Sequence, residues 1–322
     1  MIKTNPVFMR GIKSRMRGVR APILISIYLA VIAGIFALVY MSSDTADNGY
    51  YGPAARVAPV STELVGKLYL ALVIILFAMI ALMVPALNAG TISSERERQT
   101  LDLLLSSPLS ARKIVSGNLL SCMSFVAFLL VLAMPVFAIV FLFGTLSMKN
   151  ILLLFLYMMI CAYACASVAM FFSCMVKKTF LATILSYTIL LLFVVVTLLV
   201  GYNIYAKGMA DINYTPYGSE PETLQLPFVW KINPIISLIG LGSSDLSGSS
   251  PTGSVYPGSA YIYYDMGMGG FGILGSAIGV IASDVKQSYL YYSSALMLAA
   301  SVILNIAGTV LLKPVKKFQI GK

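Results

Sequence analysis

The sequence predicts an all-α protein that crosses a membrane several times. Of its 322 residues, 59% are hydrophobic and only 11% are charged, whereas charged residues make up about 25% of an ordinary soluble domain. The mean hydropathy is +0.90, and the apolar residues are gathered into long stretches without charge. This composition excludes an ordinary soluble domain, a disordered chain, a collagen and a disulfide-rich secreted scaffold.

Six stretches are long enough to span a membrane, which takes about 20 consecutive and mostly apolar residues. The expected spans cover residues 22–41, 66–88, 116–143, 150–174, 179–201 and 287–312. The first stretch exceeds the core of a cleaved signal peptide, which has about 7–15 apolar residues, so we expect it to be retained. We expect residues 1–322 to form a single transmembrane domain.

The distribution of charge predicts the orientation of these spans. With the amino terminus in the cytoplasm, the cytoplasmic segments hold most of the 22 Lys and Arg residues, and of the 12 acidic residues only Glu95, Glu97 and Asp102. Cytoplasmic loops of membrane proteins are enriched in Lys and Arg, so both termini are expected on the cytoplasmic side. The formal net charge of +10 then follows from topology, and we expect no nucleic-acid partner.

A long outer loop, residues 201–286, is expected between the fifth and sixth spans. Its residues 266–283 are apolar and rich in glycine, and a full crossing there would place the basic carboxyl terminus outside. We therefore predict a re-entrant segment, in which Gly275 and Gly279 have a small-xxx-small spacing that favours close helix packing. Together with residues 228–243, this segment would cap the exit on the outer side.

Several kinds of chemistry are excluded or disfavoured by residue type. The sequence has no His, which excludes imidazole catalysis and imidazole metal ligands. Its four Cys residues lie in apolar stretches, where a free Cys usually packs as a small hydrophobic residue. Cys161 and Cys165 share a helix face that would suit Cu(I), but packing is the commoner use, and we predict no metal site.

The predicted spans also bear on the substrate. Ion-coupled carriers place ionisable residues within their spans, and the apolar cores of these six contain none. An ion-coupled carrier and a small hydrophilic ion are therefore disfavoured, whereas an amphipathic or hydrophobic drug, lipid or peptide fits. Pro85 and Pro135 interrupt the second and third spans and are candidate kinks of a moving gate, although Pro is common in membrane helices.

Residues 91–114, a cytoplasmic segment between the second and third spans, are unlike the rest of the chain. Ser94 and Glu97 have the spacing of a capping box, which predicts that a short helix starts at Ser94. The apolar face of this helix would consist of Leu101, Leu104 and Leu105. From the residues alone, packing on lipid headgroups and docking of a cytoplasmic partner are equally consistent with it.

The same segment resembles the coupling region of ABC transporter permeases of the ABC-2 class. Such permeases carry the string S-E-R-E-x-x-T-L-x-x-L-L-x-x-P-[LV]-[ST] between their second and third spans. This sequence matches it with SERE from Ser94, TL from Thr100, LL from Leu104 and PLS from Pro108. Gln99 stands where Gly is common, and the outer loop does not obviously match, but the six-span layout extends the resemblance over most of the chain.

The resemblance implies a permease subunit of an exporter that holds no cofactor and is not itself an enzyme. The sequence indeed contains no G-x-x-x-x-G-K-[ST] phosphate-binding loop. A separate ABC-type ATPase would bind ATP and Mg²⁺ and dock on residues 94–110, and a second permease copy, identical or similar, would complete a dimer. We expect the complex in the plasma (inner) membrane of a bacterium.

The docking residues that the resemblance implies are Ser94, Glu95, Arg96, Glu97, Arg98, Thr100, Leu101, Leu104, Leu105 and Pro108. The short turn at Lys177 and Lys178 would be a second contact, although a simple topology anchor explains these two lysines equally well.

Two other classes of function stay open. A membrane enzyme would use carboxylates of the outer loop, namely Asp211, Glu220, Glu222, Asp245 and Asp265. A non-transporting sensor or scaffold would bind a ligand with the outer loop and a partner with the cytoplasmic helix. An ATPase that accompanies the chain would favour the exporter over both.

Overall fold

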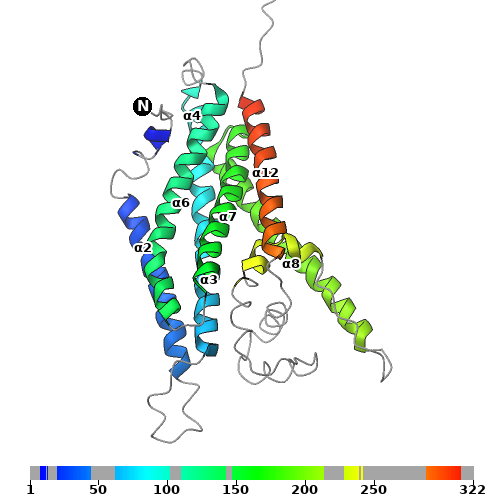
Figure 1. Ribbon diagram of the computed structural model, residues 1–322. Coiled ribbons are helices and arrows are strands. Elements are labelled where there is room, and N and C mark those ends of the chain that lie inside the picture. The colour runs from blue at the N-terminus through cyan, green and yellow to red at the C-terminus, as the bar shows by residue number, and fades with distance from the viewer. Residues whose placement is uncertain are drawn as a thin grey trace, which may run out of the picture.

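The computed structural model describes residues 8–11, 13, 20–44, 62–101, 110–142, 147–213, 228–238, 241 and 288–312. Every regular element within these ranges is a helix, and the long helices form one bundle (Figure 1). The prediction of an all-α protein is therefore confirmed for this part of the chain. The predicted re-entrant segment 266–283, with Gly275 and Gly279, lies outside the described residues.

The long helices are α2 (Arg20–Asp44), α3 (Thr62–Asn88), α6 (Ala111–Leu142), α7 (Met148–Met175), α8 (Thr179–Asn213) and α12 (Ser288–Leu312). Two shorter elements are the helix α4 (Gly90–Glu97) and the 3-10 helix η2 (Phe228–Ile232). The amino-terminal segment, α4 and the carboxyl end of α12 lie at the same end of the bundle (Figure 1). This end is called the α4 end below.

Five helical stretches have the length and apolar composition to cross a membrane, namely Leu68–Glu97, Ala111–Leu142, Met148–Met175, Thr179–Ile204 and Leu290–Leu312. In α2 the apolar stretch of described residues is shorter and runs over Ile25–Leu38. The chain is thus a multi-spanning membrane protein, whereas the count of six spans and the side of each terminus remain predictions.

Helix α8 extends beyond the predicted end of the fifth span. The fifth span was expected to end at residue 201, where the outer loop would begin, but α8 continues to Asn213. The residues that follow Gly201 are more polar, which ends the apolar stretch, yet none of them is a proline that would break a helix. Hydropathy therefore marks the end of the membrane-embedded part and not the end of the helix.

Helix α7 lies at the centre of the bundle and packs against α3, α6, α8 and α12. Half of its most apolar stretch is buried, against 11% for α8. Asn305 of α12 donates to the hydroxyl groups of Tyr163 at 2.9 Å and Ser167 at 3.1 Å, both in α7. Such interhelical hydrogen bonds set how two membrane helices pack, because apolar surface alone does not distinguish a helix from lipid.

The segment that starts with η2 is bonded to α8 on one side. Asn233, directly after η2, donates its side-chain amide to the hydroxyl of Thr197 at 2.6 Å and to the carbonyl of Val194 at 3.2 Å. Its own side-chain oxygen accepts the N–H of Ile235 at 2.9 Å. Asn233 is completely buried, so these bonds replace the water that its amide would otherwise bind.

The same segment is bonded to α7 and α12 on its other side. Ser237 donates its hydroxyl to that of Ser293 in α12 at 3.0 Å. The Ser293 hydroxyl in turn lies 2.9 Å from that of Tyr157 in α7. The first part of the predicted outer cap, residues 228–238, is therefore held inside the bundle between three helices.

A close contact between Trp230 and Gly201 completes this attachment. Trp230 lies in η2 and is 3% exposed. A Cβ atom added at Gly201 would lie 1.8 Å from the indole nitrogen of Trp230. Only glycine therefore leaves room for the indole ring against the backbone of α8.

The two prolines expected to kink the spans lie inside helices. Pro85 is near the end of α3, and Pro135 is within α6, which continues to Leu142. A proline weakens the helical hydrogen bonds of the preceding turn, and the Leu82 carbonyl in that turn of α3 accepts the hydroxyl of Tyr187 from α8. Their role in packing or gating remains a prediction.

The four cysteines, Cys122, Cys161, Cys165 and Cys174, are buried and form no disulfide with one another. The thiol of Cys161 lies 3.9 Å from the sulfur of Met297 in α12, which agrees with the predicted packing role.

Replacing Gly201 by alanine should displace Trp230, because the new methyl group would overlap the indole ring. Overpacking of this kind lowers the free energy of unfolding by about 1–3 kcal/mol. Trp230 is the only tryptophan in the sequence, so its emission maximum, measured in detergent, should shift to longer wavelength as the ring meets water. Gly34→Ala is the matched control, since nothing lies within 4 Å of a Cβ added there. Unchanged emission in Gly201→Ala would contradict the close contact.

Candidate functional site

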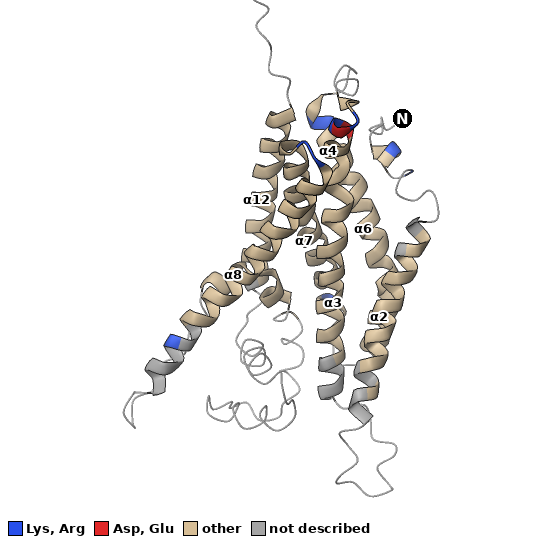
Figure 2. Cartoon of the chain, turned by 180° about the vertical axis from the view of Figure 1, so that it is seen from behind, with Lys and Arg blue, Asp and Glu red and all other residues tan. Residues whose placement is uncertain are grey.

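Charged residues of the described chain gather at the α4 end of the bundle (Figure 2). Those carried by α4 and by the neighbouring helix ends and segments are Arg10, Lys13, Glu95, Arg96, Glu97, Arg98, Arg112, Lys113, Lys177 and Lys178. The structure brings the two predicted docking contacts together here, because α4 packs against both α7 and α8. We call α4 with residues 98–101 and the α7–α8 turn at residues 176–179 the α4 junction.

The predicted start of the docking helix is wrong. Helix α4 begins at Gly90 and ends at Glu97, so Ser94 lies in its second half and not at its N-cap. The N-cap position is taken by Ala89, which makes no side-chain cap bond. Ser94 and Glu97 have the spacing of a capping box, but their side chains are not placed to form one.

The first turn of α4 is capped by a residue of another helix. The hydroxyl oxygen of Ser173 in α7 accepts the backbone N–H of Ile92 at 3.0 Å and that of Ser93 at 3.1 Å. Ser173 is completely buried, and the first N–H groups of a helix have no partner within the helix. Ser173 therefore performs the task of an N-cap across the helix–helix contact.

The end of α4 is a tight left-handed turn. The N–H of Thr100 donates to the carbonyl of Glu95 at 2.9 Å, and that of Gln99 to the carbonyl of Arg96 at 3.1 Å. This pair of bonds defines a Schellman motif, whose residue after the C-cap has a positive φ. Gln99 has φ 57°, a conformation that glycine adopts without strain. The Gly that is common at this position in the permeases that the segment resembles therefore avoids the strain of a positive φ.

This turn contradicts the predicted continuous helix from Ser94 to Leu105. Leu101 follows the turn and is partly buried against the hydrophobic core of the chain itself, so it does not extend an exposed ridge from α4. Leu104, Leu105 and Pro108 lie outside the described residues.

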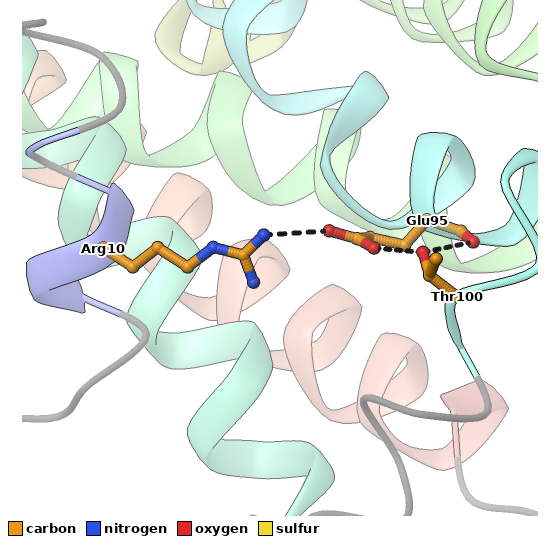
Figure 3. A network of polar contacts seen from close by, with 3 residues as sticks. All are labelled: Arg10, Glu95 and Thr100. Atoms are coloured by element: carbon orange, nitrogen blue, oxygen red, sulfur yellow. Dashed lines mark hydrogen bonds and ion pairs between the residues drawn. The ribbon is translucent and has the colours of Figure 1, made fainter.

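Glu95 connects this turn to the amino-terminal segment (Figure 3). Thr100 donates its hydroxyl to the carboxylate of Glu95 and, at 3.2 Å, to its carbonyl. A guanidinium nitrogen of Arg10 lies 3.6 Å from the carboxylate. Because the Arg10 side chain is 73% exposed, this ion pair adds little stability. The Thr100 bonds are the firmer attachment.

Glu97 binds the first residue of α8. One carboxylate oxygen accepts the backbone N–H of Thr179 at 3.0 Å, and the other accepts its hydroxyl at 3.0 Å. Helix N-termini favour negative charge because their first N–H groups are unpaired and the helix dipole is positive there. Glu97 therefore caps α8 from outside that helix.

Arg96 binds the last turn of α7. Its guanidinium donates to the carbonyl of Cys174 at 3.0 Å, where the final carbonyls of a helix have no partner within the helix. A cation at a helix C-terminus is also favoured by the dipole. Through Ser173, Arg96 and Glu97, α4 is thus hydrogen-bonded to the end of α7 and the start of α8.

The predicted site residues include Arg96 and Glu97 of α4 but not Ser173 of α7 or Thr179 of α8. Thr179, which follows Lys177 and Lys178 and precedes an apolar run, carries a recognisable helix-start signal. Ser173 lies within an apolar stretch and carries no signal of its role. Arg10 lies in a basic segment whose partner in α4 is distant in sequence.

The fold and this junction define a polytopic helical membrane protein with a charged, partly exposed helix at one end. The sequence model of the ABC-2 family transporter proteins matches residues 40–311, which is most of the chain. The chain therefore belongs to the ABC-2 family of transporter proteins, as the resemblance at Ser94–Pro108 indicated. Members are generally membrane transport subunits that lack an ATPase motif and work with an ABC-type ATPase. No curated protein is similar enough to this chain to count as a relative.

Replacing Gln99 by glycine should stabilise the turn after α4, because the left-handed conformation disfavours a side chain by about 1 kcal/mol. Thermal unfolding in detergent should show a higher midpoint. Gln99→Ala is the control, since alanine keeps the Cβ atom and should not reproduce the gain. A lower midpoint in Gln99→Gly would mean that residue 99 is not left-handed.

Replacing Ser173 by alanine should loosen the start of α4, because the N–H groups of Ile92 and Ser93 would lose their acceptor. We expect a loss of about 1–2 kcal/mol, with faster tryptic cleavage after Arg96 or Arg98. The control is Ser186→Ala, because Ser186 is equally buried but bonds a carbonyl of its own helix at 2.7 Å. Equal effects of the two substitutions would argue against the cap.

Proposed function

We propose that the chain is the permease subunit of an ATP-driven exporter and that a separate ATPase subunit binds at the α4 junction. The observation that supports this most strongly is the bonding of α4 to two other helices. A partner that displaces α4 acts on the end of α7 through Ser173 and Arg96, and on the start of α8 through Glu97.

The bonds of the α4 junction make it suitable for transmitting a displacement. Each one satisfies a helix-end group that has no partner within its own helix. The N–H groups bound by Ser173 are buried, and leaving a buried donor unpaired costs about 1–3 kcal/mol. A movement of α4 that kept these bonds would carry α7 and α8 with it. A flexible loop at the same place would absorb the movement instead.

The exposed charges of the junction suggest the chemistry of the partner surface. Glu95 and Glu97 are engaged within the chain, whereas Arg98, Lys177 and Lys178 are exposed. Complementary charge steers association and fixes orientation at interfaces. The ATPase surface that receives this junction would therefore carry carboxylates, and the ATPase would hold ATP and Mg²⁺.

The remaining parts of the proposal concern the substrate and the assembly. The buried polar residues of the described chain are Asn, Ser and Thr, which suits an amphipathic or hydrophobic drug, lipid or peptide better than an ion. The long and little-buried α8 leaves apolar surface on which a second permease copy would pack. The excess of Lys and Arg at the α4 end favours a cytoplasmic location for it, in a bacterial plasma membrane crossed by six spans.

The test is purification of the tagged chain from native membranes in mild detergent. We expect an ATPase with a phosphate-binding loop in equal amount, together with ATP hydrolysis. The double substitution Arg98→Gln and Lys178→Gln should lower its recovery roughly tenfold, because two complementary charges are lost. Lys207→Gln is the control, because Lys207 is exposed and lies 28 residues beyond Thr179 along α8.

Two outcomes would contradict the proposal. If the chain is recovered without an ATPase, a sensor or scaffold role takes its place. If the ATPase is recovered equally with the double variant and the control, its binding surface is not the α4 junction.

A further inference from the structure

Helix α8 is less buried in its apolar stretch than α6, α7 or α12. In its most apolar stretch 11% is buried, against 22% for α12, 39% for α6 and 50% for α7. Figure 1 shows α8 leaving the bundle at an angle, so that its carboxyl end stands apart from α7 and α12. It nevertheless packs against α7 and is bonded to α3 through Tyr187. Two further attachments lie at its first residue and at residues 194–201.

The first of these attachments is at the α4 end of α8. Glu97 of α4 accepts both the N–H and the hydroxyl of Thr179, the first residue of α8. The charge of the carboxylate makes these hydrogen bonds stronger than bonds between neutral groups. A displacement of α4 therefore reaches α8 at its first residue.

The second attachment lies further along the helix. Asn233 binds Val194 and Thr197 of α8, and Trp230 packs on Gly201. About 27 Å of helix separates Thr179 from Thr197, and about 18 Å extends from Gly201 to Asn213, at a rise of about 1.5 Å per residue. The segment that carries Trp230 and Asn233 is itself bonded to α12 through Ser237.

From these two attachments we infer that α8 is a lever of the transporter. Glu97 and Thr179 are positioning residues at its driven end, and the contacts of Trp230 and Asn233 form its pivot. Movement of α4 displaces Thr179, and the far end of α8 swings in the opposite direction. The lever rests on the proposed function, since the ATPase supplies the movement of α4, whereas the Glu97–Thr179 link does not depend on it.

Glu97 accepts two hydrogen bonds from Thr179, one from the backbone N–H and one from the hydroxyl, and different substitutions remove one or both of them. Glu97→Ala removes both acceptors, and Thr179→Val removes the hydroxyl but keeps the backbone N–H. Thr179→Ser keeps both donors and should behave as the parent. Thr183→Val is the matched control, because the Thr183 hydroxyl bonds the carbonyl of Thr179 within α8 at 2.9 Å and makes no bond to α4.

Hydrogen exchange in the purified chain tests the link without any partner. Loss of the bond to Glu97 should speed exchange of the Thr179 amide roughly tenfold in Glu97→Ala, the factor that corresponds to about 1.4 kcal/mol. Thr183→Val should leave that amide unchanged. If exchange at Thr179 is the same in Glu97→Ala and the parent, the link is absent and the inference fails.

Distances between nitroxide labels test the lever in the complex with its ATPase. One pair joins Phe180 to Val310 of α12 near the driven end, and the other joins Lys207 to Tyr291 of α12 beyond the pivot. All four residues are exposed, and the native cysteines are buried. The two distances should change in opposite directions between the nucleotide-free and the vanadate-trapped complex. We expect this result for the parent chain and for the Thr179→Ser and Thr183→Val variants.

Glu97→Ala should abolish both distance changes while the amides of α7 keep their protection from hydrogen exchange, which separates loss of transmission from loss of folding. Thr179→Val should reduce them. If both distances increase or both decrease, α8 translates without a pivot. If the distances in Glu97→Ala change as they do in the parent, α8 is moved through a contact other than the Glu97–Thr179 link. If no ATPase accompanies the chain, the proposed function and the lever both fail, and the exchange measurement still decides the link.

Discussion

The structure of the α4 end depends on how helix ends are satisfied where three helices meet. An α-helix leaves four N–H groups and four carbonyl groups unpaired at its ends, and burying them unpaired is unfavourable. Here α4 obtains its cap from Ser173, α7 receives a donor from Arg96, and α8 receives a carboxylate from Glu97. Each bond joins two different helices, so the requirement to pair helix ends also fixes the helices relative to one another.

This arrangement gives the charged residues of the junction two distinct kinds of role. Those that pair within the chain join α4 to α7 and α8, whereas the side chains of the exposed cations Arg98, Lys177 and Lys178 make no such bond to the described residues. The same short motif thus contains both the residues that hold the helix and those that present charge to its surroundings. Residue type alone does not separate these roles, because Glu97 and Arg98 are adjacent and both are charged.

The helices of the bundle are buried to different extents, and the polar contacts between them help to explain the difference. In lipid, apolar surface on a helix is neither favoured nor disfavoured by exposure, so specific polar contacts and close approaches decide which helices stay together. Helix α7 has several such polar contacts with α12, through Asn305 and the serine and tyrosine hydroxyl groups. Helix α8 is held by the contact of Glu97 with Thr179, by the segment that carries Trp230 and Asn233, and by the bond of Tyr187 to α3.

The sequence by itself determined the class of fold and the approximate spans, because the need for about 20 apolar residues to cross a bilayer leaves a direct trace in composition. The SERE string likewise located the α4 junction, whereas the turn at Gln99 was not predicted. Only the tertiary structure decided where α4 begins, what Glu97 binds and that α8 continues past Gly201. The physical reason is that the partners of these groups, such as Ser173 and Thr179, come from helices about 80 residues away and carry no local pattern that links them to α4.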